Sequence, residues 1–402
     1  MKSICTGLFA VTCALMFQLQ GAEAGRSKLE ILHSFGAGSD GISPEGNLIS
    51  IKGVLYGTTH FGGVYSGGAV FLVNPADQAD SLAYSFCTQP KCADGAYPAA
   101  GLIDVNGVLY GTTQKGGTSG KGTVFSADPA SRTEKVVYSF CSLQDCADGQ
   151  SPVASLIDLN GTLYGTTKVG GSAGKGTAFS VDPTTGAEQV IYSFCSQQNC
   201  ADGEAPEASL ISVNGLLFGT TFEGGAADKG TVFSIDPSTN TETVLYSFCS
   251  QKRCVDGEYP LSAVIDENGT LYGTTYGGGT RGAYGTVYAV DESTGAENVI
   301  YSFCSKKNCV DGEFPYASLV DLNGALYGTT AYGGLYNGGT VFSLNPTSGA
   351  LTLINTFCTQ QNCTDGGYPE AGVIVEKGTL YGTTIGGGSF GYGTLFSIKG
   401  IQ

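Results

Sequence analysis

The sequence predicts an all-β protein, a seven-bladed β-propeller with four antiparallel strands in each blade. Three observations support this: the pentapeptide Leu-Tyr-Gly-Thr-Thr recurs in seven units, each unit divides into four short extended segments, and the chain ends complement each other. A fixed period of about 54 residues indicates a repeat architecture in which each unit is one supersecondary structure. The aromatic residue of the pentapeptide falls at Tyr56, Tyr110, Tyr164, Phe218, Tyr272, Tyr327 and Tyr381.

One unit shows how the four strands are separated. Residues 154–159 are extended and end at an Asn-Gly pair, which favours a two-residue type I′ hairpin. Residues 163–167 return, and a glycine-rich loop leads to a third segment, residues 177–181. An Asp-Pro-Thr-Thr-Gly turn precedes the fourth segment, residues 188–194. Short strands joined by turn residues, without a helical period, predict a four-stranded antiparallel meander.

The two ends of the chain indicate how the ring closes. The last unit finishes at a third strand, residues 394–398, and the chain begins with a fourth strand, residues 29–35. We therefore expect the N-terminal strand to complete the last blade, because seven meanders packed in a ring bury the faces that one alone exposes. A linear β-solenoid is the alternative, and it would leave both ends unpaired.

Residues 1–24 have the pattern of a secretory signal peptide. Lys2 precedes an apolar run from Ile4 to Leu19, and Ala22-Glu23-Ala24 supplies the small residues of a cleavage site. A membrane anchor is the alternative, but the run is short for a membrane span. Removal of these residues would leave 378, which is seven times 54, so we expect residues 25–402 to form one propeller domain. The predicted location is secreted, extracellular or periplasmic, with no membrane span in the mature chain.

The composition limits the partners of the protein. A net charge of −16 disfavours nucleic acid, because an acidic surface repels a phosphate backbone, and it favours a soluble monomer. The 63 glycines fit an all-β chain with many tight turns. The mature chain has only two histidines, so we predict no metal site and no cofactor.

The cysteines of the mature chain form six C-x4-C pairs, and the first unit lacks both cysteines together with three residues of loop. An oxidising compartment favours six local disulfides, each worth about 2 kcal/mol, over metal binding. The expected pairs are Cys87–Cys92, Cys141–Cys146, Cys195–Cys200, Cys249–Cys254, Cys304–Cys309 and Cys358–Cys363.

Asp-Gly-x-x-Pro opens the first strand of every unit. A ring of seven carboxylates could attract cations, but a feature common to all units is more often architecture, here an Asx-type turn followed by a proline. Two Gly-x-Ser-x-Gly matches, around Ser172 and Ser389, lie between strands rather than at a strand-to-helix turn, so we do not assign a catalytic serine.

Departures from the repeat point to candidate binding residues, because a binding site for one ligand must break sevenfold symmetry. Aromatic residues occupy the glycine-rich loops of units 5, 6, 7 and 1, whereas units 2, 3 and 4 carry Lys121, Lys175 and Lys229. Exposed aromatic rings on a secreted protein favour stacking on sugars or contact with a protein, and packing across blade junctions is the alternative. The ligand-binding candidates are His60, Phe61, Tyr65, Tyr276, Tyr284, Tyr332, Tyr336, Phe390 and Tyr392.

The unit Y-S-F-C-S-x3-C-x-D-G-x2-P, continued by L-Y-G-T-T-x2-G-G and G-T-V-F, closely resembles the GloVer tandem repeat of secreted or surface bacterial proteins. The resemblance covers nearly the whole mature chain and implies a propeller-like repeat. It implies no established activity, so no catalytic residue transfers. A similarity to kelch propellers is weaker and depends on the glycine pair after an aromatic strand.

Two functions are compatible with these features. The first is a secreted, non-catalytic binding or scaffold propeller that recognises an extracellular polysaccharide or a surface protein through its aromatic loops. The second is an enzyme, a polysaccharide lyase or hydrolase or a lactonase, in which His60 would act with a carboxylate such as Glu204, Glu223, Glu258 or Glu313. We favour binding, because no acid–base pair stands out from the spacing.

Overall fold

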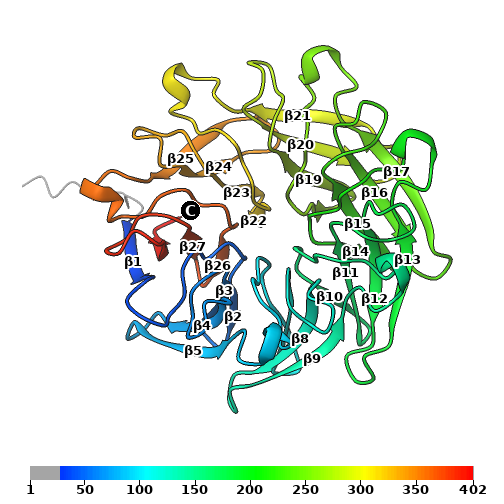
Figure 1. Cartoon of the computed structure of the whole chain (residues 1–402). Coiled ribbons are helices and arrows are strands. Elements are labelled where there is room, and N and C mark those ends of the chain that lie inside the picture. The colour runs from blue at the N-terminus through cyan, green and yellow to red at the C-terminus, as the bar shows by residue number, and fades with distance from the viewer. Residues whose placement is uncertain (1–27, 402) are drawn as a thin grey trace, which may run out of the picture.

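The computed structural model describes residues 28–401, which form a ring of seven four-stranded antiparallel sheets (Figure 1). This arrangement confirms the predicted propeller. In each blade the first strand lies nearest the axis and the fourth lies at the outer edge. The predicted signal peptide lies outside the described residues. Within residues 28–401 no helix is long and apolar enough to cross a membrane.

The strands follow the same order in every blade. The first strands are β2 (Ile49–Ile51), β6 (Ile103–Val105), β10 (Ile157–Leu159), β14 (Ile211–Val213), β18 (Ile265–Glu267), β22 (Val320–Leu322) and β26 (Ile374–Glu376). The second strands are β3 (Val54–Thr59), β7 (Val108–Thr113), β11 (Thr162–Thr167), β15 (Leu216–Thr221), β19 (Thr270–Thr275), β23 (Ala325–Thr330) and β27 (Thr379–Thr384). The third strands are β4 (Ala69–Asn74), β8 (Thr123–Asp128), β12 (Thr177–Val181), β16 (Thr231–Asp236), β20 (Thr286–Asp291), β24 (Thr340–Leu344) and β28 (Thr394–Lys399). The fourth strands are β5 (Ala79–Ser85), β9 (Thr133–Ser139), β13 (Glu188–Ser193), β17 (Thr241–Ser247), β21 (Glu297–Ser302), β25 (Leu351–Thr356) and β1 (Lys28–Ser34). Short 3-10 turns lie in the C-x4-C loops: η1 (Pro90–Cys92), η2 (Gln144–Cys146), η3 (Gln198–Cys200), η4 (Lys252–Cys254), η5 (Lys307–Cys309) and η6 (Gln361–Cys363).

The hydrophobic core consists of repeated layers between neighbouring blades. In one layer Val124 and Phe140 of the second blade pack on Leu156, Leu163 and Phe179 of the third. The rings of Phe140 and Phe179 meet edge to face with their centroids 5.0 Å apart. Each blade therefore depends on its neighbour for the burial of its apolar faces.

The ring closes as the chain ends predict. Strand β1 pairs antiparallel with β28, with His33 opposite Leu395, and so supplies the fourth strand of the seventh blade. Side chains also bridge the closure: Thr383 Oγ1 donates to the Pro44 carbonyl oxygen over 3.1 Å, and the Gly372 amide donates to Asn47 Oδ1 over 2.7 Å. The prediction of a clasped ring is confirmed.

All six expected disulfides are present. Each disulfide closes a short C-x4-C loop, which we call a disulfide hairpin. This hairpin also folds around the aspartate of the following Asp-Gly-x-x-Pro motif. Buried Asp148, for example, accepts hydrogen bonds from the Ser142 amide at 2.8 Å, the Leu143 amide at 3.2 Å and the Tyr138 hydroxyl at 2.8 Å. The aspartate therefore caps the disulfide hairpin that precedes it, rather than forming the expected turn with the residues that follow.

Candidate functional site

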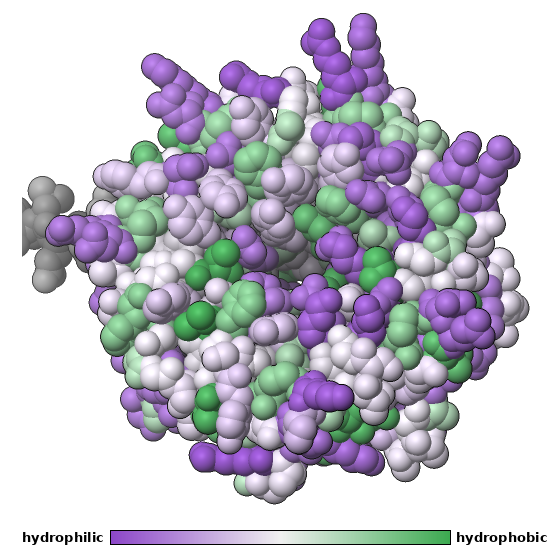
Figure 2. Space-filling view, in the orientation of Figure 1, coloured by the Kyte–Doolittle hydropathy of each residue, from purple (hydrophilic) through white to green (hydrophobic). Residues whose placement is uncertain are grey.

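A cavity follows the axis of the propeller and widens at one end, and the ring is visibly hollowed at its centre (Figure 2). The wide end, which we call the axial mouth, has a volume of about 390 Å³. It is lined by Glu45, Ala99, Val153, Lys168, Glu207, Phe222, Leu261, Tyr276, Tyr316 and Glu370.

Seven of the residues around the axis occupy one position of the repeat, directly after the proline of Asp-Gly-x-x-Pro. The residue before that proline has a positive φ, as at Ser151 (55°), so the chain turns sharply before it runs along the axis. The side chain after the proline consequently faces the cavity. This inner ring consists of Glu45, Ala99, Val153, Glu207, Leu261, Tyr316 and Glu370.

A second tier comes from the residue after each Thr-Thr pair, at the end of the second strand. Three members contact the inner ring from neighbouring strand ends. Lys168 Nζ lies 2.8 Å from Glu207 Oε1, and the rings of Tyr276 and Tyr316 have centroids 5.1 Å apart. His60 Nδ1 lies 3.3 Å from Glu45 Oε2. The mouth therefore has aromatic rings toward the fourth to sixth blades and the carboxyl groups of Glu45 and Glu370 toward the seventh and first, while Glu207 of the fourth blade is paired with Lys168.

The carboxylates of the seventh and first blades influence each other. Burial, together with the charge of Glu370, raises the pKa of Glu45 to about 7. Burial also raises the pKa of Glu370 and lowers the pKa of His60. At neutral pH the mouth thus holds a partly protonated carboxyl group beside a neutral imidazole, which together can donate and accept hydrogen bonds.

Of the residues that the sequence singles out, Tyr276 lines the axial mouth and His60 contacts its wall. The ring of Tyr332 packs at a tilt of 54° against that of Tyr368, with centroids 5.3 Å apart. Tyr284 packs against the core layer of the fifth and sixth blades. The remaining candidates lie on exposed loops: Phe61, Tyr65, Tyr336, Phe390 and Tyr392.

Two of the three lysine-bearing loops form ion pairs with the next blade. Lys175 Nζ lies 2.7 Å from Glu204 Oε2, and Lys229 Nζ lies 3.2 Å from Glu258 Oε2. Two of the four glutamates named for an enzyme, Glu204 and Glu258, are therefore paired with lysines. The carboxylate that contacts His60 is Glu45. Glu204, Glu258 and Glu313 also approach cysteine pairs, but those cysteines are in disulfides and offer no thiolate to a metal.

Comparison with known families and structures places this geometry in context. The model of the Gloeobacter/Verrucomicrobia repeat matches residues 16–174 and 151–396, which together span most of the sequence. The chain belongs to this family. No curated protein sequence matches it.

Two solved structures are similar to this member of the Gloeobacter/Verrucomicrobia repeat family. Oligogalacturonate lyase in complex with manganese is 12% identical with a TM-score of 0.50, and the match covers 93% of each chain. A chain of the nidogen/laminin complex is 11% identical with a TM-score of 0.43, over 74% of this chain and 91% of that chain. At 12% identity the similarity to the lyase shows a shared fold alone.

The parts of the Gloeobacter/Verrucomicrobia repeat that recur in every unit of this chain build the ring. The lining of the mouth comes from two variable positions, the residue after the motif proline and the residue after the Thr-Thr pair. Comparison of the seven units found variation in the glycine-rich loops but missed Glu45, Glu207 and Glu370 in the inner ring. A signal was present, because the residue after the motif proline changes from unit to unit among glutamate, small or branched apolar residues and tyrosine.

Proposed function

We propose that this protein is an extracellular, non-catalytic binding propeller that holds a neutral glycan in the axial mouth. The observation that supports this most directly is the pairing of aromatic rings on one side of the mouth with carboxylates on the other. Tyr276 and Tyr316 offer faces on which the apolar side of a sugar ring can stack. Glu45 and Glu370 offer acceptors for its hydroxyl groups.

The size and charge of the mouth narrow the class of glycan. A volume of about 390 Å³ lies at the lower end of the range for small-molecule sites, which suits one or two sugar units at the end or bend of a chain. Three carboxylates face one lysine, Lys168, which is already paired with Glu207. The negative charge of the mouth would repel a uronate or a sulfated sugar, so the ligand is uncharged.

The test is a glycan array probed with the mature protein, followed by titration calorimetry on the best neutral oligosaccharide. We expect Tyr276→Ala and Tyr316→Ala each to weaken binding by at least tenfold. The matched control is Tyr336→Ala, which removes an equally large ring from an exposed outer loop and should leave the affinity unchanged. A preference for uronates, or a loss caused by Tyr336→Ala alone, would exclude the axial mouth as the glycan site.

A hydrolase is the second candidate, and the contact between His60 and Glu45 favours it. A carboxyl group with a pKa of about 7 can act as a general acid near neutral pH. If the protein cleaves its glycan, mass spectrometry will detect shorter products, and Glu45→Gln will abolish them while binding persists. An intact glycan after prolonged incubation with the wild-type protein rejects this candidate and leaves the binding function standing.

A further inference from the structure

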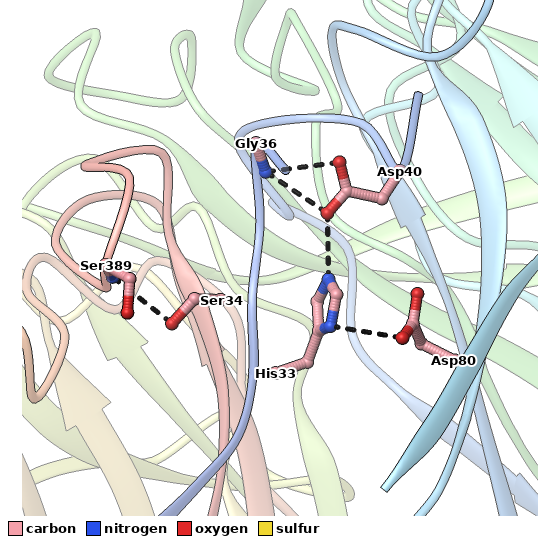
Figure 3. Close-up of polar contacts among 6 residues, drawn as sticks. All are labelled: His33, Ser34, Gly36, Asp40, Asp80 and Ser389. Carbon is pink, nitrogen blue, oxygen red and sulfur yellow. Dashed lines mark hydrogen bonds and ion pairs between the residues drawn. The ribbon is translucent and has the colours of Figure 1, made fainter. Parts of the chain in front are cut away.

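A second cavity lies far from the axis, where the seventh blade meets the first. Its volume is about 290 Å³, and it is bounded by the outer strands β1 and β5 and the loop that joins β1 to the first blade. Figure 3 shows the imidazole of His33, on β1, lying between the carboxyl groups of Asp40 and Asp80. We call this space the closure pocket.

The closure pocket exists because this junction lacks two parts that fill the others. At five junctions a tyrosine stands in the place of His33 and its hydroxyl bonds the buried aspartate of the next blade, as Tyr138 does with Asp148. All six other junctions are also covered by a disulfide hairpin, whereas the loop from Phe35 to Asp40 is three residues shorter and has no cysteines.

The walls of the closure pocket are polar and acidic over an apolar floor. The rings of Phe35 and Phe71, with Leu82, form the apolar surface. Asp40 is held in place, because its carboxylate accepts the Gly36 amide at 3.2 Å and His33 Nε2 at 2.9 Å. The side chain of Asp80 is more exposed than that of Asp40, at 46%.

The polar groups leave one interaction unmade. The imidazole of His33 is oriented by Asp40, whose Oδ2 lies 2.9 Å from Nε2. Nδ1 faces Asp80 Oδ1 at 3.8 Å, which is too long for a hydrogen bond. The carboxylate of Asp80, 46% exposed, and the remaining lone pairs of Asp40 are therefore open to a donor that enters the pocket.

We propose that the closure pocket binds a primary ammonium group on a short alkyl stem. The ammonium supplies donors for the carboxylate of Asp80 and for the open lone pairs of Asp40. The stem lies against Phe71 and Leu82. This chemistry belongs both to a lysine side chain of a partner polypeptide and to a free aliphatic diamine.

The first experiment uses n-butylammonium as the probe and n-butanol as its uncharged counterpart, titrated into the mature protein and followed by NMR. We expect the ammonium to bind at least tenfold more tightly than the alcohol and to weaken as salt is added. Asp80→Asn and His33→Tyr should each weaken ammonium binding at least tenfold, the second by placing the ring of the other junctions in the pocket. Asp77→Asn, on the neighbouring exposed turn, is the matched control and should have no effect.

A second pair of probes separates the sources of the ammonium group. Tighter binding of acetyl-Gly-Lys-Gly-amide than of cadaverine assigns the pocket to a lysine side chain, and the reverse assigns it to a diamine. Equal binding of n-butylammonium and n-butanol, or full ammonium binding by folded His33→Tyr protein, overturns the proposal. Glycan binding at the axial mouth should be the same in the His33→Tyr variant and the wild-type protein, so the two proposals are tested independently.

Discussion

The glycine that precedes the third strand of each unit packs against the proline of the Asp-Gly-x-x-Pro motif in the next blade. At Gly122, where φ is +108°, a Cβ atom would lie 2.5 Å from the Thr113 carbonyl oxygen and 2.6 Å from Pro152 Cδ. The same proline contact recurs around the ring, and Gly393 meets Pro44 at the closure. The Gly-Thr and Asp-Gly-x-x-Pro motifs are therefore two halves of one contact between blades.

This contact predicts a large cost for a single methyl group. We expect Gly122→Ala to lower the free energy of unfolding by about 3 kcal/mol, from backbone strain and overlap with Pro152. Gly120→Ala is the control: φ is also positive, at +71°, but nothing lies within 4 Å of the added atom, so we expect about 1 kcal/mol. Urea unfolding of both variants checks this, and equal losses would show that strain alone matters.

Residue-level function was harder to predict than residue-level architecture. Repetition identified the glycines, prolines and cysteines, because each unit needs them for the same contact. The inner ring is different, because which variable residue faces the axis depends on the turn at positions such as Ser151 and on the pleat that follows. Sequence spacing does not give that orientation, so Tyr276 and His60 were identified while Glu45 and Glu370 were not.

At the scale of elements, turn chemistry was a reliable guide and strand length was not. Asn160 and Gly161 have φ values of 56° and 84°, as the predicted hairpin requires. The first strand, however, covers Ile157–Leu159 rather than residues 154–159. Its first residues bond to neighbouring blades instead, as where Thr112 Oγ1 donates to the Ala154 carbonyl oxygen over 3.0 Å. A contact between blades has no local sequence signature.

The disulfide hairpins have two supports, and their separate contributions can be measured. Replacing Cys141 and Cys146 together by serine removes the covalent closure of a short loop and should cost about 2 kcal/mol. The hairpin itself should persist, because Asp148 still binds its amides. Urea unfolding gives the cost and crystallography the loop conformation. A disordered loop in the double variant would show that the aspartate cap cannot hold the hairpin alone.

At the scale of the whole molecule, four blade junctions share a buried carboxyl group on the fourth strand. Burial, together with the neighbouring aspartate, raises the pKa to about 8 in Glu134 and Glu242 and to about 7 in Glu188 and Glu297. Each has at least one carboxyl oxygen without a hydrogen-bond partner. Because the core consists of junction layers, their titration acts on the ring as a whole.

The junction glutamates make the propeller less stable as pH rises from about 4.5 to about 8. In this range the unfolded chain, with ordinary carboxyl pKa values, releases protons that the folded ring retains, so the unfolded state binds fewer protons and stability falls. Each group should contribute about 1 kcal/mol after solvent screening. Replacing all four by glutamine should flatten the dependence of the thermal midpoint on pH between 4.5 and 8.5. Replacing the four hairpin-turn residues Asp104, Asp158, Asp266 and Asp321 by asparagine removes the same charge at the hairpin turns and should leave the slope intact. An equal flattening in both quadruple variants would assign the effect to net charge rather than to the buried junctions.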